Sequence, residues 1–248
     1  MRSFAEYRAA VELIERGHND CEIERLLGVP RRTVLDWRHG RRKSIAPAAA
    51  CPGDHDYARY ATPAYAYLLG AYLGDGYISR SKQTFVLRLS LDSGYPGIVE
   101  EVAAAMETVW PTARTFRVYR CGGGCVEVGM RSRHWPCLFP QHGLGRKHER
   151  AIVLAAWQRD AVDRYVESFL RGLIHTDGCR FVARDVSGGK TREYVRYSFS
   201  NRSDDIKAMF SDACRALGIH CAPAGSREIA ISRRADVLRM EEFVGPKC

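Results

Sequence analysis

Apolar residues recur at helical spacing through the first forty positions of the chain, and two glycines interrupt the pattern. This pattern predicts a first amphipathic helix from Phe4 up to Gly17, and a second helix that Asp20 caps and that ends at Gly28. A third helix follows a short turn, and its buried face holds Thr33, Val34 and Trp37. Three short helices, the last two joined by a turn that contains glycine, indicate a small all-α unit.

Basic residues crowd the third predicted helix and the positions just after it. Six cations fall within positions 31–43 beside a single carboxylate, Asp36. Positive charges this closely spaced repel one another unless a polyanion neutralises them. The recognition helix of a helix-turn-helix lies in the major groove of DNA, where the phosphates supply that negative charge. The stretch Gly28–Lys43 also resembles the helix-turn-helix of resolvase-like and transposase-like proteins. We therefore expect a helix-turn-helix domain over residues 1–43, with a solvated helical hairpin as the alternative. Its expected DNA contacts are Arg31, Arg32, Thr33, Arg38, Arg41, Arg42 and Lys43.

A linker and then an internal repeat follow this unit. Residues 44–60 contain two prolines and no useful periodicity, which predicts a flexible tether. Beyond it, the segment Leu68–Gly76 recurs as Leu170–Gly178, and each copy is a helical run that ends in Asp-Gly. Small residues four positions apart leave one stripe of each helix without large side chains, so the two helices can pack closely. The residues expected at this helix interface are Gly70, Gly74, Gly172 and Thr176.

The repeat also places one carboxylate at the end of each helix. Asp75 and Asp177 lie 102 residues apart and would converge if the two helices pack together. Two neighbouring carboxylates repel each other, but they suit a divalent cation that accepts oxygen ligands, here Mg²⁺ or Mn²⁺. Such a metal can activate water against a phosphodiester. A single Asp-Gly at a helix end is more often a plain turn, but the same nine-residue pattern occurs twice.

Both segments resemble the LAGLIDADG motif of homing endonucleases, and the resemblance covers roughly residues 61–248. It implies an α+β fold of two pseudo-symmetric α-β-β-α-β-β repeats, residues 61–157 and 158–248, that together form a saddle. The small all-α domain precedes them in the sequence. The expected strands are Tyr77–Ser79, Phe85–Leu91, Arg180–Ala183 and Tyr194–Ser200, and the expected second helices are Gly97–Val109 and Ser203–Leu217. Two further strands would complete each repeat.

The resemblance also implies roles for individual residues. Asp75 and Asp177 would be the metal-binding catalytic carboxylates, and strand residues that face the saddle would contact double-stranded DNA. A supporting lysine and glutamine have Lys147 and Gln141 as candidates. Further DNA contacts are expected at Lys82, Thr84, Arg88, Arg131, Arg133, Arg180, Arg184, Arg192, Arg196, Arg233 and Arg234.

Composition supports a nucleic-acid partner and limits other functions. The 248 residues carry a net charge of +9, which favours a polyanion over an acidic protein as the partner. No apolar run is long enough for a membrane helix, so we expect a cytoplasmic protein. The nine cysteines are scattered, as reduced thiols would be. A zinc site is conceivable, but its spacing fits no common pattern; its ligands would come from Cys121, Cys125, Cys137, His134 and His142.

Two other functions remain open on the same fold. A LAGLIDADG-derived body joined to a helix-turn-helix also describes DNA-binding transcription regulators that have lost cleavage, although acidic motif residues often decay in them. An RNA-splicing maturase is a third possibility, with nothing in the sequence to favour it. We expect a sequence-specific DNA endonuclease, and both repeats in one chain suggest that a monomer is sufficient.

Overall fold

A computed structural model describes residues 4–40, 55–81, 84–119, 123–187 and 190–245. The chain divides into two compact units, the first built around residues 1–53 and the second holding 54–81 and 85–248. Each unit is considered by itself.

The first unit is a three-helix cluster. It consists of α1 (Phe4–Glu15), α2 (Asp20–Leu27) and α3 (Arg31–Arg38). Trp37 packs edge-on against Tyr7, with ring centroids 5.3 Å apart. The core of this unit holds the buried side chains of Ala10, Ile23, Val29, Val34 and Trp37.

The cap of α2 differs from the prediction by one residue. Asn19, not Asp20, is the N-cap, because its side chain accepts hydrogen bonds from the backbone N–H groups of Cys21 and Glu22. The Glu22 carboxylate accepts a hydrogen bond from the backbone N–H of Asn19, which completes a capping box. Asp20 instead pairs with Arg38 at 2.8 Å and fastens α3 to the start of α2.

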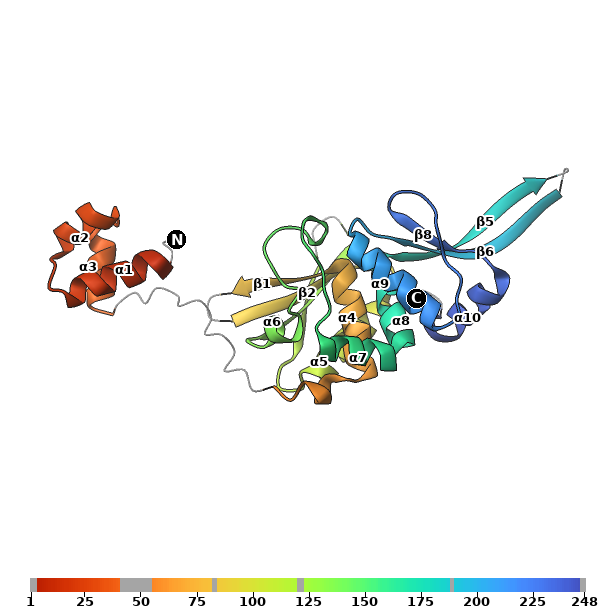
Figure 1. The fold of residues 1–248 in the computed structure, drawn as a ribbon, viewed down its shortest axis with the longest axis horizontal. Coiled ribbons are helices and arrows are strands. Elements are labelled where there is room, and N and C mark those ends of the chain that lie inside the picture. Colours follow the sequence, from red (N-terminus) through yellow and green to blue (C-terminus); the bar gives the residue numbers. More distant parts are fainter. Residues whose placement is uncertain (1–3, 41–54, 82–83, 120–122, 188–189, 246–248) are drawn as a thin grey trace. The chain divides into compact units, whose positions relative to one another are not determined.

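The second unit contains the same α-β-β-α-β-β order twice (Figure 1). The first copy is α4 (Pro63–Asp75), β1 (Gly76–Ser81), β2 (Thr84–Asp92), α5 (Pro96–Val109), β3 (Thr115–Tyr119) and β4 (Cys125–Ser132). The second is α8 (Val166–Asp177), β5 (Gly178–Ser187), β6 (Lys190–Ser200), α9 (Asp204–Ala216), β7 (Ala222–Pro223) and β8 (Glu228–Ile231). The sheets have matching strand orders, β1-β2-β4-β3 and β5-β6-β8-β7. The predicted α+β fold of two pseudo-symmetric repeats is confirmed.

Shorter elements connect and extend the repeats. They are η1 (Tyr57–Tyr60), α6 (Trp135–Leu138), η2 (Lys147–Glu149), α7 (Ala156–Arg164) and α10 (Arg234–Val244). The ring of Tyr57 stacks on Trp157 of α7 with centroids 4.7 Å apart, so residues 57–60 pack on the body. The expected linker over 44–60 therefore ends earlier than residue 57. Most of it, residues 44–54, lies outside the described residues.

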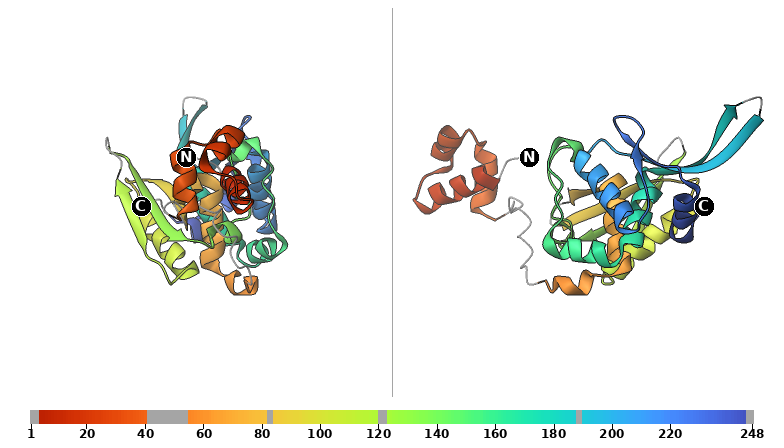
Figure 2. Two further views of the ribbon diagram at one scale, coloured as in Figure 1. Left: turned by 90° about the vertical axis from the view of Figure 1, so that its left-hand side faces the viewer. Right: turned by 45° about the vertical axis from the view of Figure 1, so that its right-hand side comes forward.

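The two motif helices α4 and α8 lie side by side at the centre of the second unit in both views (Figures 1 and 2). α4 is buried from Tyr65 to Leu73, because α5, α7 and α8 all pack against it. A helix buried on every side needs an apolar sequence all round, which explains its lack of a polar face. No helix in the described part of the chain is long and apolar enough to span a membrane.

Candidate functional site

Gly70 of α4 and Gly172 of α8 bring the two helix backbones into direct contact. A Cβ atom on Gly70 would overlap the carbonyl oxygen of Phe169 and lie 3.0 Å from the amide nitrogen of Leu173. A Cβ atom on Gly172 would overlap the carbonyl oxygen of Tyr67 in the same way. The two contacts are equivalent under the repeat, so the pseudo-two-fold axis passes between these glycines.

One turn further along, the ends of the two motif helices also pack closely. A Cβ atom on Gly74 would lie 2.7 Å from Thr176 Cβ and 3.3 Å from the carboxyl carbon of Asp177. Asp75 is the next residue after Gly74 and the last residue of α4. The close packing of the small residues therefore places both aspartates at one end of the helix pair.

Lys147 reaches this end of the helix pair from the connection between the repeats. Its Nζ donates hydrogen bonds to the carbonyl oxygens of Tyr72, Leu73 and Gly74, at 2.5, 2.9 and 2.6 Å. These carbonyls belong to the last turn of α4, and that of Tyr72 also accepts the backbone N–H of the C-cap residue Gly76, so the ammonium caps α4. Burial lowers the pKa of Lys147 to about 8, while Asp177 and Asp75 act in the opposite direction. The site thus combines two carboxylates with one half-buried ammonium.

A hollow of about 400 Å³ opens beside Asp177 and Lys147. The side-chain amide of Asn201 donates a hydrogen bond of 2.5 Å to Asp177 Oδ2 and so orients this carboxylate. Three arginines also line the hollow, and their side chains suit a phosphate group. They are Arg146, Arg202 and Arg227. No role was predicted for these arginines or for Asn201, since none belongs to a motif copy.

The two carboxylates fit a hard divalent cation. In the described residues, no group of three or more His, Cys, Asp and Glu side chains gathers around one point. Magnesium typically uses one or two protein carboxylates and fills its other positions with water and substrate phosphate. Asp75 and Asp177 match that donor set, and substrate oxygens would complete it.

Gln141, the candidate supporting glutamine, does not line this hollow. Its side-chain nitrogen donates to Gln158 Oε1 at 2.5 Å and to the carbonyl of Val153 at 2.9 Å. Gln158 in turn donates to the hydroxyl of Tyr65 at 2.7 Å. Gln141 therefore belongs to a buried polar network that joins α7 to the start of α4.

The first sheet holds Arg88 in an internal ion pair. Its guanidinium contacts the buried carboxylate of Glu127 and donates to Ser79 Oγ at 3.2 Å. The hydroxyl of Tyr77 donates to the same carboxylate at 2.7 Å. Arg88 is therefore less accessible to DNA than the sequence suggested, because its side chain neutralises Glu127. Of the other expected contacts here, Thr84 is half-buried, whereas Arg131 and Arg133 are exposed.

The second sheet divides its expected arginines between two faces. Arg180 pairs with Glu241 at 2.5 Å and Arg184 with Glu193 at 2.9 Å. Since side chains alternate along a strand, the register places Arg192 and Arg196 on the opposite face. Arg233 and Arg234 are exposed where α10 begins.

In the first unit, Arg31 and Arg32 are exposed, and Thr33 is half-buried. Arg38 is also exposed, and its guanidinium pairs with Asp20 at 2.8 Å and donates to the carbonyl oxygen of His18 at 2.6 Å. Four expected DNA contacts lie outside the described residues: Arg41, Arg42, Lys43 and Lys82.

The described members of the conceivable zinc set make other contacts. His134 stacks on Trp110 and has its Nδ1 3.3 Å from His55 Nε2. His142 packs edge-on against Phe85. Cys125 and Cys137 are half-buried, and Cys121 lies outside the described residues.

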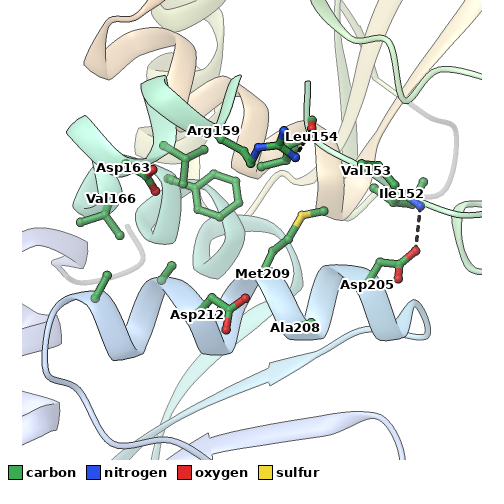
Figure 3. A pocket seen from close by; sticks show the side chains of 14 residues that line it. Ile152, Val153, Leu154, Arg159, Asp163, Val166, Asp205, Ala208, Met209 and Asp212 are labelled. Atoms are coloured by element: carbon green, nitrogen blue, oxygen red, sulfur yellow. Dashed lines mark hydrogen bonds between the residues drawn. The ribbon is translucent and has the colours of Figure 1, made fainter. Parts of the chain in front are cut away.

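A second hollow, of about 360 Å³, is separate from the motif aspartates Asp75 and Asp177 (Figure 3). It lies between α9, α7 and residues 152–154, and Met209 points into it. Asp205 accepts a 2.7 Å hydrogen bond from the backbone N–H of Ile152 at one end. The lining is mostly apolar and includes neither motif aspartate, so this hollow is not part of the carboxylate site.

Comparison with known proteins gives similar solved structures only. No family model and no curated protein matches the chain. A structure of I-DmoI in complex with DNA and Mn is 15% identical, with a TM-score of 0.49, over 76% of this chain and 99% of that one. The LAGLIDADG meganuclease I-AabMI bound to uncleaved DNA is 10% identical, with a TM-score of 0.46, over 72% and 82%. Full-length DUF199/WhiA from Thermatoga maritima is 12% identical, with a TM-score of 0.45, over 76% and 60%. Thus LAGLIDADG homing endonucleases are among the similar structures.

Proposed function

We propose that this protein is a sequence-specific DNA endonuclease that hydrolyses phosphodiester bonds with Mg²⁺ or Mn²⁺ held by Asp75 and Asp177. One observation carries the proposal: two helices in backbone contact end in carboxylates at the same end of the helix pair, beside the half-buried ammonium of Lys147. Two neighbouring carboxylates repel each other and so destabilise the folded protein, unless a bound cation compensates their charge.

Each residue of the site has a defined task in this proposal. The bound metal would supply the activation of water and the neutralisation of charge on the phosphate. Asn201 holds the Asp177 carboxylate in one orientation through its 2.5 Å hydrogen bond. The ammonium of Lys147 stabilises the negative charge that collects at the carboxylates and the phosphate. Arg146 and Arg202 are placed at the hollow to bind the phosphate backbone.

The proposed partner is double-stranded DNA, bound by a single chain. The net charge of +9 supplies a favourable sequence-independent attraction to phosphate. The first unit contributes exposed cations on α3, the helix that a helix-turn-helix places in the major groove. We place the protein with its substrate, in the cytoplasm at the nucleoid.

A DNA-binding regulator without nuclease activity is the second candidate, and one observation favours it. Lys147 already places a positive charge beside Asp75 and Asp177, so the carboxylates are partly compensated without a metal. In that case the aspartates would serve to hold the lysine and the helix ends together.

Incubation with a random DNA library and Mg²⁺, followed by sequencing of the new ends, tests the proposal. We expect ends enriched at one sequence, and none when EDTA replaces the metal. A library that stays intact, although the protein enriches a specific sequence by binding, would favour the regulator.

A further inference from the structure

Helix α9 ends in a turn that reverses the chain. The backbone N–H of Ile219 donates to the carbonyl oxygen of Cys214 at 2.9 Å, and that of Gly218 donates to the carbonyl oxygen of Arg215 at 3.0 Å. Gly218 has a φ of 70°, the left-handed conformation that this type of helix end requires. Because the turn closes on the end of α9, the residues after it, Cys221 among them, run back along the helix.

Cys221 lies directly before β7, and its thiol contacts α9. The sulfur is within hydrogen-bonding distance of the side chains of Ser211 and Cys214. These two residues are three positions apart on α9, so they share one face of the helix. Cys214 is fully buried in the core, and Cys221 is half-buried and packs against the same core. The two thiols therefore touch, one inside the core and the other at its edge.

The surroundings of the two thiols give them different acidities. The hydrogen bond from Cys214 lowers the pKa of Cys221 below its usual value, and a second hydrogen bond from Ser211 acts in the same direction. His220 and Arg215 lower this pKa further, while burial opposes them. The same hydrogen bond and burial raise the pKa of Cys214. Cys221 is therefore the more acidic and more reactive thiol of the two, and Cys214 keeps its proton.

We propose that Cys221 and Cys214 form a redox-active pair that hydrogen peroxide oxidises to a disulfide. The Cys221 thiolate attacks one oxygen of the peroxide, and the O–O bond breaks. The other oxygen leaves as hydroxide and becomes water with the proton that Cys221 lost. Cys221 is then a sulfenic acid, and the sulfur of Cys214 displaces its oxygen. The S–O bond breaks, and that oxygen leaves with the Cys214 proton as a second water. Two thiols thus give two electrons to one molecule of peroxide.

The cysteine pair is separate from the carboxylate site. Asn201, which binds Asp177, precedes α9, whereas Cys214 lies near the other end of this helix, about 15 Å along it. The disulfide would instead fasten the start of β7 to α9. β7 is the edge strand that pairs with β8 through Ala222 and Ala230. The inference therefore concerns the edge of the second sheet and does not rest on the proposed nuclease.

Trypsin separates the two cysteines, so a bond between them can be detected directly. Cleavage after Lys207, Arg215 and Arg227 places Cys214 in peptide 208–215 and Cys221 in peptide 216–227. The reduced full chain is treated with hydrogen peroxide, its remaining thiols are blocked with N-ethylmaleimide, and the digest is analysed by mass spectrometry. We expect the two peptides to be linked, with the mass of two hydrogen atoms lost, and to separate again after treatment with dithiothreitol.

Cys179 provides an internal comparison, because it is exposed whereas Cys221 is only half-buried. The linked peptides should form at a peroxide concentration severalfold below the one that oxidises Cys179. Cys214→Ser keeps a hydrogen-bond donor but has no second sulfur, so Cys221 should stop as a sulfenic acid that dimedone labels. The wild type should take up much less dimedone at Cys221, because Cys214 removes the sulfenic acid.

Two results would overturn the inference. One is oxidation that modifies Cys179 first and leaves peptides 208–215 and 216–227 unlinked, a comparison that needs no variant. The other is equal dimedone labelling of Cys221 in the wild type and in Cys214→Ser, because the second thiol would then not react with the sulfenic acid. Linked peptides at low peroxide support the inference, whether or not the protein cuts DNA.

Discussion

Replacement of Gly70 by alanine should loosen the contact between α4 and α8. The new methyl group would overlap the main-chain oxygen of Phe169, whereas ordinary contacts of a Cβ atom are 3.4–4 Å long. The obstacle is backbone, so no side-chain rotation relieves it, and the helices must move apart by about 1 Å. Overpacking of this kind costs about 1–3 kcal/mol, and the better helix propensity of alanine returns at most about 1 kcal/mol. We expect a net loss of about 1–2 kcal/mol and a melting temperature lower by roughly 2–8 °C.

A second glycine provides the matched comparison. At Gly74 the obstacle is the side chain of Thr176, which a mutation can remove. Gly74→Ala alone should destabilise the protein, and the exchange Gly74→Ala/Thr176→Gly should restore most of the stability, because it moves the methyl group from one helix to the other. Gly70→Ala should not be rescued by Phe169→Ala, since the clash is with a carbonyl oxygen.

Thermal and denaturant unfolding of these four variants measures the effect. Cleavage should fall more steeply than stability, because displaced helix ends separate Asp75 from Asp177. A Gly70→Ala protein as stable as the wild type would show that the helices are not in backbone contact and would refute the geometry of the site.

Three other predictions follow from the same site and from the division of the chain. Millimolar Mg²⁺ or Mn²⁺ should raise the melting temperature, and Asp75→Asn/Asp177→Asn should abolish the rise; an unchanged wild-type curve would count against metal binding. The pKa of Lys147 is lowered from 10.5 to about 8 in the folded protein. Between these two pH values the unfolded chain therefore binds more protons than the folded protein, so the free energy of unfolding should increase as the pH rises. Lys147→Met should lack this increase, and urea unfolding of both proteins at pH 7.5 and 10 would reveal it; parallel pH profiles would contradict the lowered pKa. Deletion of residues 1–43 should weaken DNA binding and flatten its salt dependence, by about 0.9 for each phosphate that the shortened protein no longer neutralises; an unchanged slope in salt titrations would mean that the first unit does not touch DNA.

The local sequence pattern predicted the elements that carry the site. The repeat of small residues and Asp-Gly was sufficient to place two helices together, because a helix stripe without side chains has few other uses. The expected strands lie within β1, β2, β5 and β6. The helix Gly97–Val109 agrees with α5, and Ser203–Leu217 spans α9 with its two flanking cap residues.

Contacts between distant residues could not be predicted in this way. Arg88 has the pattern of a DNA-facing arginine, but its partner Glu127 is 39 positions away and is buried in the same sheet. Lys147 lies in a connection without periodicity, so nothing local indicates that it reaches the end of α4. The length of the β5–β6 hairpin was underestimated because its outer residues are polar and have no core to pack on.

The most direct test compares binding and cutting by the aspartate variants on one selected target. Asp75→Asn and Asp177→Asn keep the size of each side chain and remove its negative charge, so a metal ligand is weakened while the helix contact is preserved. Binding is measured by mobility shift in Ca²⁺, and cutting is measured in Mg²⁺. We expect that the wild type cuts and that each variant binds at least as tightly but yields no product. Tight, sequence-specific binding by a wild type that forms no product in Mg²⁺ would contradict the nuclease and support the DNA-binding regulator.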